Sequence, residues 1–201
     1  MPVQVVSQLV KGLAVWKTIS NRLHRISTTQ VTLSAFVLFL LFSALVLPAQ
    51  SARADSYAGN AQSPDTSFFY SADDLYDTAR AYGEQGRRAY IRSRFTFDLI
   101  WPLVYTLFLS TATTWAVRRA FAEDSPWQLA NLVPLCGAAF DYLENVSTSL
   151  VMLRYPSPTA VVDMLAPAFS AIKWMLLGGS FVLLLVGMLV AAWRWVRHAT
   201  G

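Results

Sequence analysis

Apolar residues gather into four long runs that contain few charges. The runs cover residues 31–47, 97–117, 127–152 and 164–190. A helix of about 20 apolar residues crosses the hydrocarbon core of a bilayer, which is roughly 30 Å thick. The pattern predicts an all-α, polytopic membrane protein with a four-transmembrane-helix bundle. Its first span covers residues 29–48, and the other three form a membrane core over residues 97–195.

The segment before the first span, residues 1–28, has the spacing of a helix with one apolar face. Its apolar positions are Val6, Leu9, Leu13, Trp16, Ile19, Leu23 and Ile26, and its basic residues include Lys11, Lys17, Arg22 and Arg25. A basic amphipathic helix of this kind binds the surface of an anionic leaflet. We expect it on the cytoplasmic face, and a helix that binds a partner protein is the alternative.

Residues 49–96 are expected to lie outside the membrane. Residues 48–67 lack periodicity and are rich in Ala, Ser, Asp and Pro, which predicts a flexible linker. Ser71 and Asp74 have the spacing of a capping box, so a second amphipathic helix should begin there and lead into the second span. Ala52-x-Ala54 has the form of a signal-peptidase site. The long basic segment before the first span favours an uncleaved helix, and cleavage is the alternative.

Composition and charge support a membrane protein. Of the 201 residues, 55% are hydrophobic and 14% are charged, against about 25% charged in soluble domains. The net charge of +4 comes from basic residues beside the apolar runs, a pattern that indicates contact with membrane lipid and excludes nucleic acid. Basic flanks at residues 11–25, 118–119 and 194–197 predict a multi-pass protein of the inner or plasma membrane with cytoplasmic termini, including the tail at residues 196–201. Cys136 is the only cysteine, so no internal disulfide can form.

The third span carries polar residues on one helical face. Asp141, Glu144, Asn145 and Thr148 follow i, i+3, i+4 and i+7 spacing. A charged side chain at the centre of a membrane helix costs about 2.5–3.5 kcal/mol on insertion scales. These carboxyls must therefore face protein or water, and they are candidate functional residues.

Counting depth from the helix ends identifies partners for this face. At about 1.5 Å of rise per residue, Lys173 of the fourth span and Tyr105 of the second lie level with Glu144. We expect a Glu144–Lys173 pair, with Asp141 one turn deeper, protonated and beyond the reach of Lys173. Asp98 and Arg94 would guard the mouth of an outward-facing pocket. A simple structural ion pair is the alternative, but the acids outnumber the lysine, which favours a binding or reactive site.

Motifs of known chemistry are absent. The sequence contains no P-loop, Rossmann fingerprint, HExxH or GxSxG motif, and both histidines lie outside the predicted spans. We therefore predict no cofactor and no metal site of the histidine type, although carboxyl oxygens leave Mg²⁺ or Ca²⁺ open.

The sequence resembles uncharacterised bacterial integral membrane proteins with four spans. The resemblance covers about residues 71–174. It is carried by the run YGEQGRRAY at residues 82–90 and by Asp98, Pro102, Tyr105, Asp141, Glu144, Asn145, Lys173 and Trp174. It implies no activity, and it favours an uncleaved first helix.

Three functions fit these observations. The first is an outward-facing intramembrane pocket that binds a cationic or amphiphilic small molecule or a lipid head group. The second is a membrane enzyme that acts on a lipid, with Asp141 or Glu144 as general acid or base and Tyr105 assisting. The third is an accessory or scaffold subunit, which would bind a membrane-protein partner or a second copy of the chain. An exposed apolar face on the first or fourth span would favour the scaffold.

Overall fold

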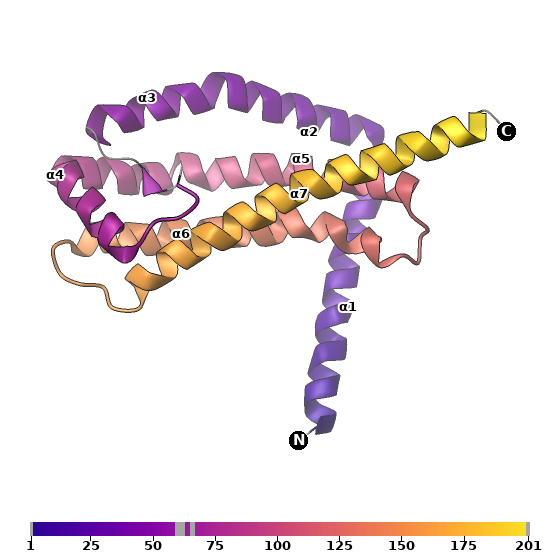
Figure 1. Ribbon diagram of the computed structural model, residues 1–201, viewed down its shortest axis with the longest axis horizontal. Coiled ribbons are helices and arrows are strands. Elements are labelled where there is room, and N and C mark those ends of the chain that lie inside the picture. The colour runs from indigo at the N-terminus through magenta and orange to yellow at the C-terminus, as the bar shows by residue number, and fades with distance from the viewer. Residues whose placement is uncertain (1, 59–62, 65–66, 200–201) are drawn as a thin grey trace. The chain divides into compact units, whose positions relative to one another are not determined.

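The computed structural model describes residues 2–58, 63–64 and 67–199, and these residues form helices without any strand (Figure 1). In chain order, the helices are α1 (Pro2–Ile26), α2 (Thr29–Leu41), the π-helix η1 (Phe42–Val46), α3 (Leu47–Ala58), α4 (Ala72–Arg94), α5 (Phe97–Ala120), the 3₁₀-helix η3 (Pro126–Leu132), α6 (Val133–Arg154) and α7 (Val162–Ala199). The all-α prediction is confirmed.

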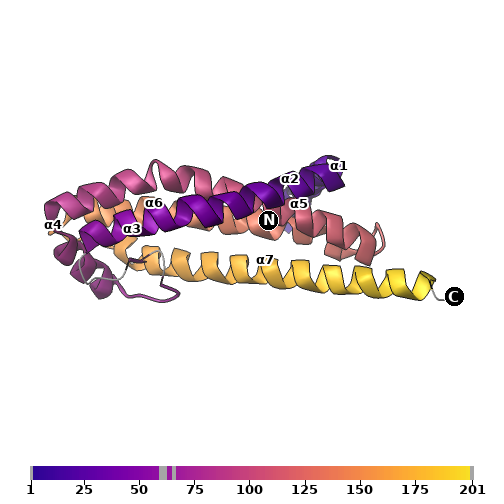
Figure 2. The ribbon, with the colours of Figure 1, turned by 90° about the horizontal axis from the view of Figure 1, so that it is seen from above.

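Three stretches of the described chain are long and apolar enough to cross a membrane. They are Thr29–Ala58, Ala72–Ala120 and Val162–Ala199, which contain α2–α3, α4–α5 and α7. Both the first, at 30 residues, and the last, at 38 residues, exceed the length of about 20 residues that a span needs. Figure 2 shows α7 as one uninterrupted helix. The helix α6, expected as the third span, is not among these stretches, because Asp141, Glu144 and Asn145 lower its hydropathy.

The prediction of a flexible linker over residues 48–67 is wrong for residues 48–58. Residues 47–58 are helical and continue directly from α2 through η1. Pro48 lies in the first turn of α3, just after a π-turn in which the N–H of Leu47 bonds to the carbonyl of Phe42, so its missing N–H costs little. The alanines that follow favour a helix. Residues 59–62 and 65–66 of the expected linker lie outside the described residues.

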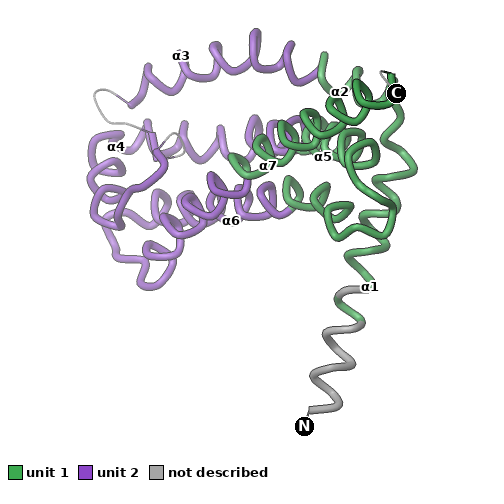
Figure 3. Tube along the Cα trace, turned by 45° about the vertical axis from the view of Figure 1, so that its right-hand side comes forward, with its two compact units in different colours: residues 1–37, 106–135, 177–201 green, residues 38–105, 136–176 purple. Residues whose placement is uncertain are grey.

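The chain divides into two compact units, which are described separately (Figure 3). Unit 1 comprises residues 1–37, 106–135 and 177–201, and unit 2 comprises residues 38–105 and 136–176. The core of unit 2 joins α3, α4, α6 and α7. It consists of Ala58, Leu75, Ala79, Tyr82, Tyr90, Val151, Met152 and Ala166.

In unit 2, α4 begins at the capping box that the sequence predicts, and it bends at Gly83. The hydroxyl of Ser71 accepts a hydrogen bond from the backbone N–H of Asp74, whose carboxylate accepts one from the backbone N–H of Ser71. Gly83 has a φ of 61°, a left-handed conformation that favours glycine, and it kinks the helix. At Gly86, an added Cβ would lie 3.0 Å from the backbone oxygen of Tyr57, so this glycine allows α3 to approach α4 closely.

In unit 1, buried polar groups attach α1 to η3 and α5. The hydroxyl of Ser20 donates to Oδ1 of Asn131 at 3.0 Å, and Nδ2 of Asn131 donates to the hydroxyl of Thr114 at 3.1 Å. The helix predicted over residues 1–28 is therefore present, although the side chains of residues 2–10 and Leu13 lie outside the described residues. Trp16 and Ile26 on its apolar face are exposed by 45% and 51%.

The close approach at Gly86 generates a first prediction. The substitution Gly86→Ala should lower the midpoint of thermal unfolding in detergent, because overpacking of this kind costs about 1–3 kcal/mol and exceeds the gain in helix propensity of about 1 kcal/mol. The matched control is Gly178→Ala in α7, where an added Cβ meets nothing within 4 Å. The control should be neutral or stabilising, and equal behaviour of the two variants would contradict the packing at Gly86.

Candidate functional site

The polar face of α6 is buried in unit 2. The exposed fractions of Asp141, Glu144, Asn145 and Thr148 are 8%, 1%, 4% and 0%. Because successive polar positions lie one turn apart on a helix, the carboxyls of Asp141 and Glu144 form a short ladder along α6.

Lys173 of α7 lies between these two carboxyls and is itself only 3% exposed. Its Nζ is 2.5 Å from Oε2 of Glu144 and 3.7 Å from Oδ1 of Asp141. The expected contact with Glu144 is present, but the expectation that Asp141 lies beyond the reach of Lys173 is wrong. One helical turn is a rise of only about 5.4 Å, so a lysine placed between the two acids reaches both.

Each carboxyl also accepts a hydrogen bond from a tyrosine. The hydroxyl of Tyr105, on α5, donates to Oδ2 of Asp141 at 2.8 Å. The hydroxyl of Tyr70, in the segment before α4, donates to Oε1 of Glu144 at 3.3 Å. The ammonium and the two phenols thus position the carboxyls from three different parts of the chain.

The contribution of residues 67–70 was not predicted from the sequence. The hydroxyl of Ser170 donates to the carbonyl of Ser67 at 3.3 Å, and the ring of Phe68 stacks on Trp174 at 4.9 Å. Together with Tyr70, these contacts hold the segment against α7 and over Glu144. The outward-facing pocket expected at these carboxyls is therefore closed in the structure. Three consecutive aromatic residues just before a helix cap were the only signal for this cover.

Asn145 and Thr148, which lie on the polar face that we expect to bind a ligand, differ in their surroundings. The hydroxyl of Thr148 donates to the backbone carbonyl of Glu144 at 2.9 Å, so its donor is satisfied within the helix. In contrast, Nδ2 of Asn145 is buried and has no hydrogen-bond partner among the described residues. A buried amide donor without a partner is costly in apolar surroundings, so Asn145 retains a hydrogen bond that a ligand or water could accept.

Arg94 and Asp98 form a separate ion pair rather than the mouth of a pocket. Nε of Arg94 lies 3.0 Å from Oδ2 of Asp98, and the two side chains are only 7% and 9% exposed. The guanidinium of Arg94 also lies over the ring of Tyr90, a core residue, with 4.6 Å to the centroid. The expected position at an exposed mouth is therefore wrong: both side chains are buried, and their i,i+4 spacing lets them pair with each other.

The two buried ionic groups of unit 2 differ in composition. Asp141 and Glu144 both contact the ammonium of Lys173, whereas Asp98 contacts the guanidinium of Arg94. Among the described residues, no three His, Cys, Asp or Glu side chains converge as metal ligands.

Comparisons with protein-family models, with curated proteins and with solved structures find no match for this chain. The class of protein that the fold defines is an all-α protein with helices able to cross a membrane. Its function is argued from the site alone.

The contacts of Lys173 generate a second prediction. The substitution Lys173→Met should destabilise the protein by about 3–5 kcal/mol, because it leaves two buried carboxyls without a counter-charge. Combining it with Glu144→Gln should recover much of this loss, and chemical unfolding in detergent would measure the double-mutant cycle. The control Lys17→Met, at an exposed position of α1, should change stability by no more than about 0.5 kcal/mol. Additive losses in the cycle would contradict a direct Glu144–Lys173 interaction.

Proposed function

We propose that this chain is an integral membrane protein whose polar site in unit 2 binds the cationic group of an amphiphilic small molecule or of a lipid head group. The observation that carries the proposal is that two buried carboxyls, of Asp141 and Glu144, meet beside one buried ammonium, that of Lys173.

The site differs from the Arg94–Asp98 pair of the same unit, in which one acid contacts one base. Around Lys173, two acids contact one base. Charges in a medium of low dielectric constant interact strongly with a charge of opposite sign. Two neighbouring carboxyls on one helical face therefore suit a ligand that brings a positive charge.

The site offers a cationic ligand both charge and orientation. An ammonium group could contact Asp141, which lies farther from Lys173 than Glu144 does, at 3.7 Å against 2.5 Å. Asn145 adds a donor for a neighbouring acceptor group of the ligand. Trp174 and Phe68 provide aromatic surface for an alkyl chain or a second cationic group.

Entry of such a ligand requires residues 67–70 to move away from Glu144. The contacts that would break are the hydrogen bond from Tyr70 to Glu144, the hydrogen bond from Ser170 to Ser67 and the stacking of Phe68 on Trp174. Each is a single weak interaction, worth about 0.5–1.5 kcal/mol. A charged ligand that balances the site could therefore compensate for opening it.

A second candidate function is a membrane enzyme that acts on a lipid. The hydrogen bond of 2.8 Å between Tyr105 and Asp141 favours it, because a phenol and a carboxyl in contact can relay a proton to or from a bound substrate. This function uses the same site, with Asp141 or Glu144 as general acid or base.

The scaffold alternative has the exposed apolar face that it requires. Most apolar residues of α2 and α7 are exposed: only 6% and 11% of their most apolar stretches are buried. Lipid tails would cover the same surfaces in a membrane protein, so this exposure fits the scaffold and the other two functions equally.

The charge of the site generates a third prediction, on ligand binding. The substitution Asp141→Asn keeps an acceptor for Tyr105 and leaves Glu144 paired with Lys173, so folding should be close to wild type. It should abolish stabilisation by an alkyltrimethylammonium added below its micellar concentration, measured as a shift in the thermal unfolding midpoint. An alkyl sulfate of equal chain length, which carries a negative charge, should stabilise neither wild type nor the Asp141→Asn variant.

The matched control for this experiment is Asp163→Asn. Asp163 also accepts a hydrogen bond from a tyrosine, Tyr76, at 3.0 Å, but it lies outside the site. The control variant should respond to the alkyltrimethylammonium like wild type. Full stabilisation of Asp141→Asn by this compound would mean that the acid is structural, and the scaffold alternative would then be preferred.

The proposed topology has four spans in the inner or plasma membrane, with α6 as the third and with both termini cytoplasmic. It is supported by the basic residues at the ends of the apolar helices, since Lys and Arg accumulate on the cytoplasmic side. With only the three stretches of clear hydropathy as spans, the two termini would lie on opposite sides.

This difference generates a fourth prediction. Reporters fused after residues 60 and 158 should lie outside the cytoplasm, and reporters after residues 122 and 201 should lie inside it. Compartment-specific alkaline phosphatase and fluorescent-protein fusions would measure this. Residues 122 and 158 flank α6, so finding both on one side would exclude α6 as a span.

A further inference from the structure

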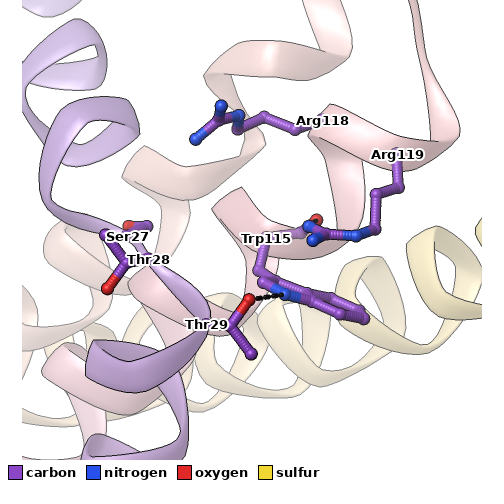
Figure 4. A pocket seen from close by; sticks show the side chains of 6 residues that line it. All are labelled: Ser27, Thr28, Thr29, Trp115, Arg118 and Arg119. Atoms are coloured by element: carbon purple, nitrogen blue, oxygen red, sulfur yellow. Dashed lines mark hydrogen bonds between the residues drawn. The ribbon is translucent and has the colours of Figure 1, made fainter.

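Two adjoining pockets in unit 1 share Thr28 and Arg118. The first has a volume of about 480 Å³ and is lined by Ser27, Thr28, Thr29, Trp115, Arg118 and Arg119 (Figure 4). The second has a volume of about 710 Å³ and includes Arg25, His24 and Glu123. Both belong to unit 1, so they are independent of the polar site of unit 2.

The pockets carry an excess of positive charge. Their lining includes three exposed arginines, Arg25, Arg118 and Arg119, against one glutamate, Glu123. Burial lowers the pKa of His24 below its usual 6.5, a hydrogen bond to the carbonyl of Gln128 opposes this, and the charge of Arg118 adds to the lowering. His24 is therefore uncharged at neutral pH, and the arginines determine the charge.

Arg118 and Arg119 are oriented by backbone carbonyls and not by acids. Nη1 of Arg118 donates to the carbonyl of His24 at 3.0 Å, and Nη1 of Arg119 donates to the carbonyl of Trp115 at 3.0 Å. Neither forms an ion pair with a described residue. A guanidinium has five N–H donors, so each arginine retains donors and its full charge. Two positioned arginines that lack a counter-ion favour a bidentate anion such as phosphate.

Trp115 and the start of α2 form the other walls of the first pocket. The guanidinium of Arg119 lies over the Trp115 ring, 3.9 Å from its centroid, and the indole N–H of Trp115 donates to the hydroxyl of Thr29 at 3.2 Å. Figure 4 shows these side chains of α5 facing residues 27–29. The positive end of the α2 dipole adds to the potential of the arginines.

The position of the pockets along the chain indicates where an anion would come from. Thr29 begins the first apolar stretch, and Arg118 and Arg119 follow the apolar part of α5. Tryptophan and arginine at the ends of membrane helices lie at the level of the lipid head groups. The geometry points to a binding site for the phosphate group of an anionic phospholipid at this interface.

The test uses the purified full chain and two lipids, phosphatidylglycerol and phosphatidylcholine, titrated in detergent and followed by native mass spectrometry. Wild type should bind phosphatidylglycerol saturably and more tightly than phosphatidylcholine. The double variant Arg118→Gln with Arg119→Gln should weaken binding of phosphatidylglycerol by about tenfold or more. The single variant Arg119→Gln, whose hydrogen bond lies within its own helix, should show part of this loss without disturbing α1.

The matched control is Arg194→Gln with Arg197→Gln at the end of α7. Arg197 lies over the ring of Trp193, at 4.3 Å, as Arg119 lies over Trp115. This control should leave the affinity for phosphatidylglycerol unchanged. An equal loss in both double variants would overturn the proposal, because any basic helix end would then suffice. Binding of inorganic phosphate with the same arginine dependence, without preference for phosphatidylglycerol, would overturn the lipid as its source.

Discussion

Burial of charge away from water is the constraint on which unit 2 depends. The buried ammonium of Lys173 lies 2.5 Å from the carboxyl of Glu144 and 3.7 Å from that of Asp141, and a buried lysine needs such contacts to offset its desolvation. These contacts fix the register of α7 against α6. The hydrogen bond from Tyr105 to Asp141 fixes the position of α5 relative to α6 in the same way. A shift of any of these helices by one turn would break these contacts at a cost of several kcal/mol. Apolar side chains can pack in several registers, so it is the polar group that specifies one register.

The sequence predicted the helices well wherever one physical signal dominated. Apolar runs of membrane length located α2, α5 and α7, and the Ser71–Asp74 pair located the start of α4. It failed over residues 48–58, where a proline and polar residues suggested a linker. The helix there continues from the preceding π-turn, and it packs against α4 where Tyr57 approaches Gly86. The second of these is a contact between distant segments, which a local sequence pattern does not reveal.

The site, like the helices, was predicted correctly where a regular local pattern determined it. Helical spacing brought Asp141 and Glu144 together, and depth counting brought Tyr105 and Lys173 to their level, because both depend only on the regular geometry of a helix. The direction of a side chain around its helix axis does not follow from depth. The inward turn of Arg94 and Asp98 and the position of Tyr70 over Glu144 therefore required the folded structure.

The two buried ionic groups of unit 2 provide an internal comparison. Arg94 and Asp98 lie within one short segment, match charge for charge, and could form as soon as the α4–α5 junction does. The group around Lys173 draws on α5, α6, α7 and residues 67–70, and it brings two carboxyls to one ammonium. If stability alone were required, a local pair of one acid and one base would achieve it with fewer constraints. The proposed ligand accounts for this difference, because a positively charged group would use the second carboxyl.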